Sequence, residues 1–138
     1  MLIFKNDNQE LMNEFYKLRS KNIDLYHLIE DLEVFVDSYF QKNVVITMVF
    51  RSQEKQDEIY QGTYRKDRSY DKKPWRSPHQ FWHSVDIRSH NFNEDEIDKI
   101  EKFLNENGND TNYYKWTAKN HEVNNGGEHF HIQYIRKA

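Results

Sequence analysis

The sequence predicts an α+β domain in which N-terminal helices pack on a small, mainly antiparallel sheet. Apolar residues recur at helical spacing through the first 41 residues, and short β-branched or alternating segments dominate from residue 44 onward. The length of 138 residues suits one domain with a single core. We therefore expect one domain over residues 1–138.

Two amphipathic helices are expected first, over residues 8–20 and 23–41. Their apolar residues recur every three or four positions, which places them on one face of each helix. These apolar positions are Leu11, Phe15 and Leu18 in the first helix and Leu25, Leu28, Ile29, Leu32, Phe35, Val36 and Phe40 in the second.

The apolar run VVITMVF at residues 44–50 predicts a buried strand, because it is β-branched and too short to span a membrane. Ser52 is a candidate N-cap for a helix that extends to about residue 60. The polar and basic residues 61–76, which include Pro74, predict a long loop of the kind that is often functional.

The remaining elements are shorter. Residues 81–88 predict a strand, and a helix is expected to begin after its cap Asn93 and to end at Gly108. A short strand is expected near residues 112–116. The alternating segment EHFHIQYI, residues 128–135, predicts the last strand of the antiparallel sheet.

The composition limits the possible chemistry. The chain has no cysteine, which excludes a disulfide framework, a thiolate zinc site and a thiol nucleophile. The net charge of -3 gives no general attraction to nucleic acid or to an anionic membrane. The apolar N-terminal stretch is short, so we expect synthesis in the cytoplasm without a signal peptide and no membrane insertion. We also expect a monomer.

Histidines cluster with an aspartate in two of the predicted strand segments. RSPHQFWHSVDIRS contains His79 and Asp86, and EHFHIQYI contains His129 and His131 on one face, since strand side chains alternate. If these strands are neighbours, His131 can meet His79 and Asp86 around one ion. Three N/O ligands leave a fourth position for water, which is the pattern of a catalytic zinc site.

The other histidines are not expected to bind the metal. His83 alternates away from Asp86 and is expected to face elsewhere. His27 on a helix, His90 at a strand end and His121 in a loop are expected to be structural or surface residues.

SPHQFWHSVD resembles the Ser-x-His-x-x-Gly-x-Ala-x-Asp signature of a zinc peptidase family. This family contains D-Ala-D-Ala carboxypeptidases and L-alanyl-D-glutamate endopeptidases, including VanY-type enzymes and phage endolysins. Ser77, His79 and Asp86 match its fixed positions. Trp82 and Ser84 stand where the family has Gly and Ala, which predicts a reshaped groove beside the zinc and an altered choice of substrate.

EHFHIQYI resembles the Glu-x-x-His of the same family, with Glu128 and His131 at the matching positions and Phe130 where Trp is frequent. It is also similar to the His-x-His of the wider Hedgehog/DD-peptidase fold, with His129 as its first member. The resemblance extends over about residues 44–136 and implies that fold.

The resemblance implies one Zn²⁺ per chain, held by His79, Asp86 and His131. Glu128 would accept the proton of the metal-bound water and pass it to the leaving amine. Because Glu128 and His131 differ in parity, this role requires the chain around NNGGE, residues 124–128, to leave regular strand geometry. His129 would hydrogen-bond the developing oxyanion, or else is a supporting or surface residue.

A third match, FRSQEKQ, resembles the family's aromatic-Arg-Ser-x-x-x-Gln and places Arg51, Ser52 and Gln56 after the first strand. Arg51 would anchor a substrate carboxylate, unless it is an exposed residue at a strand end. Ser77 either supports the same substrate or caps a turn, and Gln56 is assigned to the substrate site. Trp75 and Trp82 are equally compatible with the core and with walls of the groove.

The function implied is a zinc-dependent peptidoglycan peptidase that cuts a stem-peptide bond, either as an L-Ala-D-Glu endopeptidase or as a D,D-carboxypeptidase. A compact phage endolysin that reaches the cell wall after holin release fits this pattern, as does a host enzyme that recycles wall peptides. One alternative is a noncatalytic, Hedgehog-like zinc domain, which the presence of Glu128 argues against.

A second alternative is single-stranded nucleic-acid binding through the basic aromatic segment YRKDRSYDKKPWR, residues 64–76. Six Lys or Arg residues less two Asp residues give this segment a charge of +4. The same charge suits an anionic wall polymer, so the sequence alone leaves both partners open.

Overall fold

The computed structural model describes residues 1–52, 54–55, 77–123 and 127–138. Residues 54 and 55 are helical. The rest of the helix expected up to about residue 60, and nearly all of the expected loop up to residue 76, lie outside the described residues. In the part of the chain that is described, no helix is long and apolar enough to cross a membrane.

The two N-terminal helices are confirmed. Helix α1 spans Gln9–Lys21 and α2 spans Ile23–Phe40. Asn8 and Asn22 cap them, because each side-chain oxygen accepts a hydrogen bond from a backbone N–H of the first turn. The apolar positions at helical spacing form the buried face of each helix, which includes Phe15, Leu18, Leu25, Ile29, Leu32 and Val36.

The five strands form one mixed sheet in the order β1-β2-β3-β5-β4. Strand β1 (Leu2–Phe4) runs parallel to β2 (Val44–Met48). Strands β3 (Ser84–Arg88), β5 (Gly127–Gln133) and β4 (Ala118–Val123) follow, and every pair from β2 onward is antiparallel. The predicted α+β class and its mainly antiparallel sheet are therefore confirmed.

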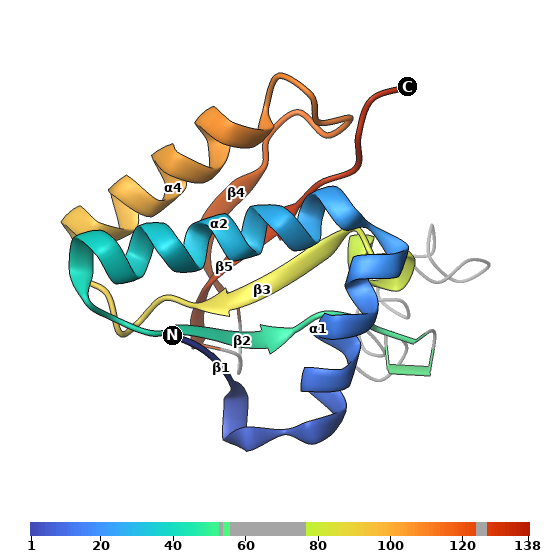
Figure 1. The fold of residues 1–138 in the computed structure, drawn as a ribbon, viewed down its shortest axis with the longest axis horizontal. Coiled ribbons are helices and arrows are strands. Elements are labelled where there is room, and N and C mark those ends of the chain that lie inside the picture. Colours follow the sequence, from blue (N-terminus) through green and yellow to red (C-terminus); the bar gives the residue numbers. More distant parts are fainter. Residues whose placement is uncertain (53, 56–76, 124–126) are drawn as a thin grey trace, which may run out of the picture.

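Helices α2 and α4 cover one face of this sheet (Figure 1). Helix α4 spans Glu94–Gly108 and begins with a capping box between Asn93 and Glu96, as the predicted cap requires. At Gly108 a Cβ atom would lie within 2.4 Å of Thr117 Oγ1, so only glycine permits this close approach. The core between the helices and the sheet includes Phe15, Leu32, Ile87, Leu104 and Phe130.

The strand predicted over residues 81–88 is shorter than expected, because β3 begins at Ser84. The residues before it form the 3₁₀ helix η3, Pro78–Phe81. Ser77 caps this helix with a capping box, and proline at the first helical position has its φ already fixed for a helix. These local signals override the alternating pattern, so His79 lies on a helix and not on a strand.

The short strand predicted near residues 112–116 is wrong. In this region the described structure has only an isolated bridge between Asn112 and Arg136. The Asn112 side chain donates to the Trp116 and Gln133 carbonyl oxygens and to Thr117 Oγ1, and these bonds hold a turn. The strand lies further on, as β4. Strand β1 was not predicted, because its three residues are too few to show a period.

Candidate metal centre

Strands β3 and β5 are neighbours, as the metal hypothesis requires. Asp86 pairs directly with His131, and Arg88 pairs with His129. Side chains opposite each other in an antiparallel pair lie on the same face of the sheet. All four therefore lie on the face turned away from the core, because the intervening residue Ile87 is buried in the core.

Helix η3 brings His79 to the same place. Its backbone N–H donates to Ser77 Oγ (3.3 Å), and its carbonyl oxygen accepts from the backbone N–H of Arg51 (3.2 Å). His79 is 1% exposed, and its Nε2 lies 3.1 Å from Asp86 Oδ1. A residue outside the sheet thus completes a cluster that the strands begin.

The three predicted ligands converge on one point. His79, Asp86 and His131 each offer a ligand atom within 4.8 Å of the others, and His131 Nδ1 lies 3.0 Å from Asp86 Oδ1. The second ring nitrogens have acceptors: His79 Nδ1 donates to the Val49 carbonyl (3.1 Å), and His131 Nε2 donates to Gln133 Oε1 (3.1 Å). If a metal replaces the protons between these rings and Asp86, these bonds favour the tautomers whose inward nitrogens bind it.

The charge of Asp86 also suits a cation site. Burial raises the pKa of this carboxyl group, but the neighbouring His79 and His131 outweigh that effect and hold the pKa well below its usual range. Asp86 is therefore ionised at neutral pH. Two imidazoles and one carboxylate form a donor set that fits zinc in a catalytic site.

Two further aromatic side chains stand beside the cluster. His121, which was expected in a loop, lies on β4 opposite His129, and the two ring centroids are 4.6 Å apart. The Trp116 ring centroid lies 5.8 Å from that of His131. Sequence analysis missed both positions, because placing them requires β4, whose polar sequence does not resemble a buried strand.

His129 faces the cluster, whereas Glu128 does not. His129 Nε2 lies 3.6 Å from Asp86 Oδ2. Glu128 pairs within the regular β4–β5 ladder, shares the face of Phe130, and its carboxylate accepts a hydrogen bond from Asn120 Nδ2. The departure from strand geometry expected around residues 124–128 lies largely outside the described residues, whereas Gly127 and Glu128 themselves pair in register in β5.

Arg51 lies beside the cluster at the start of β3. Its guanidinium Nη2 donates to Met48 Sδ at 2.9 Å, and Met48 pairs with Asp86 in the sheet. Only 9% of Arg51 is exposed, so it is not the freely exposed residue that was the alternative. Gln56, which was assigned to the substrate site, and Trp75, for which core and groove wall were both open, lie outside the described residues.

The comparison with known families agrees with this geometry. A model of the VanY family, described as D-alanyl-D-alanine carboxypeptidase, matches residues 26–137. The chain belongs to this family. The matched range contains the three clustered residues, and the family predicted from the motifs is confirmed. Searches of curated proteins and of solved structures returned no match.

The structure explains how this VanY-family chain accommodates Trp82 in place of glycine. Trp82 ends η3 in the left-handed conformation, with φ 62° and ψ 31°, which glycine adopts without steric cost. Its ring stacks on Phe50 with centroids 4.6 Å apart. The second replacement, Ser84, is fully buried opposite Gln133. His83 points elsewhere, as expected, with Nδ1 3.2 Å from Tyr114 Oη.

Proposed function

We propose that the protein is a zinc-dependent peptidase that hydrolyses an amide bond of the peptidoglycan stem peptide. The observation that supports this proposal most strongly is the convergence of His79, Asp86 and His131 in a chain of the D-alanyl-D-alanine carboxypeptidase family. One Zn²⁺ per chain would be held by these three residues. A three-ligand set leaves room for water, as a hydrolytic site requires.

A zinc ion bound here would lower the pKa of its water to about 7 and polarise the substrate carbonyl group. Hydrogen bonds within the chain orient the two imidazole ligands. The Val49 carbonyl and the Gln133 amide oxygen hold the rings of His79 and His131, so the ligand nitrogens face Asp86 without rearrangement. Such supporting bonds commonly change metal affinity by a factor of 10 to 100.

Two motif residues are the proposed catalytic groups, Glu128 as the proton acceptor and His129 as a hydrogen-bond donor to the oxyanion. His129 already faces the cluster and suits a hydrogen bond to the oxyanion. Glu128 must leave Asn120 to reach a metal-bound water, and its neighbour Gly127 has the backbone freedom for a local rotation. Ligand-free geometry often leaves catalytic groups misaligned until substrate binds, so Glu128 remains the proposed general base.

Arg51 is proposed to bind a free carboxylate of the substrate, and Ser77 and Gln56 are the other motif residues proposed to bind substrate. Its partial burial beside Met48 supports this role, because a guanidinium group in a desolvated setting binds carboxylates strongly. Such an anchor fits either proposed bond, the terminal D-Ala or L-Ala-D-Glu. A role as a phage endolysin that acts on the wall after holin release is the proposed context.

Mass spectrometry of muropeptides after digestion tests the proposal. The zinc-loaded protein should convert purified wall peptides to products that lack a terminal D-Ala or that are cut between L-Ala and D-Glu. The Asp86→Asn variant should release neither product. If the zinc-loaded parent leaves all muropeptide masses unchanged, the protein is not a peptidase of this substrate, and the noncatalytic zinc domain becomes the better account.

A further inference from the structure

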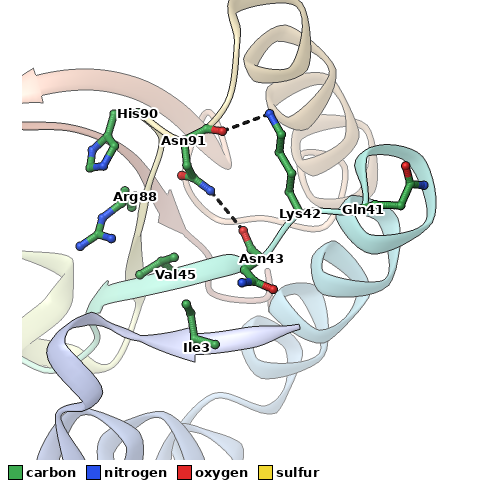
Figure 2. Close-up of a pocket in the computed structure, with 8 residues that line it drawn as sticks. All are labelled: Ile3, Gln41, Lys42, Asn43, Val45, Arg88, His90 and Asn91. Atoms are coloured by element: carbon green, nitrogen blue, oxygen red, sulfur yellow. Dashed lines mark hydrogen bonds between the residues drawn. The ribbon is translucent and has the colours of Figure 1, made fainter.

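A cationic pocket lies next to the metal centre, at the end of β3. Its volume is about 430 Å³. Ile3 and Val45 contribute apolar surface from β1 and β2, and Arg88 and His90 come from the end of β3 and the residues after it (Figure 2). None of the described residues that line the pocket is Asp or Glu. The pocket therefore suits a negatively charged group.

Arg88 carries the available charge in this pocket. Lys42, the other permanent cation, is already paired: its Nζ lies 2.7 Å from Glu96 Oε1 and 3.1 Å from the Asn91 carbonyl oxygen. The Arg88 guanidinium has no hydrogen bond or ion pair to another residue in the described part of the chain. Figure 2 shows Arg88 and His90 at the end of the pocket away from Lys42.

The position of Arg88 relates the pocket to the metal centre. Arg88 follows Asp86 by two residues and pairs with His129, so its side chain leaves the same face of the sheet. The rise of a strand puts its Cα about 7 Å from that of Asp86. Strand β2 runs antiparallel to β3 and ends at Met48, opposite Asp86. Arg51 follows Met48 by three residues and therefore lies toward the other end of β3. Two guanidinium groups thus stand on opposite sides of the three clustered residues.

We propose that, when the terminal D-Ala is the leaving group, Arg88 binds a second carboxylate of the substrate, remote from the bond that is cut. This inference rests on the proposed function and specifies its substrate: stem peptides in which the γ-linked D-Glu keeps a free α-carboxylate. A planar guanidinium binds such a group through two parallel hydrogen bonds, which a carboxamide does not accept equally well. The protein therefore discriminates against stem peptides in which this residue is D-isoglutamine.

A matched pair of substrates tests the inference. One is the acetylated peptide L-Ala-γ-D-Glu-L-Lys-D-Ala-D-Ala, whose only internal carboxylate belongs to D-Glu, and the other carries D-isoglutamine instead. For release of the terminal D-Ala, the parent enzyme should show a kcat/KM about 10- to 100-fold higher with the D-Glu peptide, as expected for a charge-assisted hydrogen bond. Arg88→Gln should abolish this preference by slowing the D-Glu peptide alone, and Arg88→Lys should retain part of it.

Arg136→Gln is the control, because Arg136 is exposed and paired with Asp24 away from both sites. Equal rates of the parent on both peptides, or an unchanged preference in Arg88→Gln, would overturn the inference while leaving the peptidase activity intact. If the protein cuts neither peptide, calorimetric titration with the same two peptides tests the Arg88 subsite without relying on catalysis. Tighter binding of the D-Glu peptide that is lost in Arg88→Gln would support the subsite, and equal binding would refute it.

Discussion

Replacing Glu128 by Gln separates catalysis from folding, because the structure assigns this side chain a contact that an amide can keep. In the parent, the Glu128 carboxylate accepts a hydrogen bond from Asn120 Nδ2. The amide oxygen of Gln accepts the same bond, so the free energy of unfolding should change by less than about 1 kcal/mol. Zinc content should be unchanged, since Glu128 is outside the proposed ligand set. An amide, however, cannot accept a proton from water.

General acid–base catalysis contributes roughly 10²- to 10⁴-fold, so kcat/KM of Glu128→Gln should fall by about that factor. The position of Glu128 adds a second expectation. If its carboxylate must leave Asn120 before it acts, breaking that bond opposes catalysis by about 0.5–1.5 kcal/mol. Asn120→Ala should then raise kcat/KM by about two- to tenfold, and this increase should be absent in the double variant with Glu128→Gln.

The assay is hydrolysis of a stem peptide followed by chromatography, with zinc content and urea denaturation measured on each variant. His129→Gln is the matched comparison, because His129 is the neighbouring motif residue and faces the cluster. A Glu128→Gln variant that cleaves as fast as the parent would refute the reasoning. If His129→Gln were then slower by 10²-fold or more, the proton acceptor would be His129.

Three other predictions follow from the same contacts. Arg51→Lys keeps the charge but loses the two-point fork, so kcat/KM on wall peptides should fall about tenfold with zinc content intact; an unchanged rate would show that Arg51 does not anchor the substrate carboxylate. Trp82→Ala and Trp82→Gly both lose the stacking on Phe50, but only Ala keeps a Cβ at φ 62°. In urea denaturation, Trp82→Gly should be more stable than Trp82→Ala by about 1 kcal/mol. Equal stabilities of the two variants would show that the left-handed conformation at residue 82 is unstrained. Asp86 has a lowered pKa in the folded state, so its contribution to stability is complete above its ordinary value of 3.8 and is lost as the pH falls below it. Metal-free protein should therefore lose stability more steeply below about pH 4 than Asp86→Asn, and parallel curves would contradict this.

Sequence reasoning succeeded where the pattern was long or where two strands had to be neighbours. The helices were predictable because their apolar period extends over 13 and 18 residues. The clustering of Asp86 and His131 was predictable because the segments that carry them alternate and are both antiparallel strands of one small sheet. Neither step required long-range information beyond the pairing of β3 with β5.

The rest of the site depends on contacts that no local pattern reveals. His79 reaches Asp86 only because the Ser77 cap and Pro78 begin a 3₁₀ helix inside an apparently strand-like segment. His121 approaches His129 only through β4, an edge strand with mostly polar residues. The orientation of Glu128 depends on the register of β5, and a shift of one residue would move it to the other face.

The zinc content of the His131→Ala variant decides whether His79, Asp86 and His131 together hold a metal ion. We predict one zinc per chain in the parent and a loss of zinc in His131→Ala, because two remaining ligands bind zinc weakly. His121→Ala is the control, since His121 lies near His131, with ring centroids 6.2 Å apart, but outside the ligand set, and it should keep its zinc. Full zinc content in His131→Ala would contradict the metal centre described here.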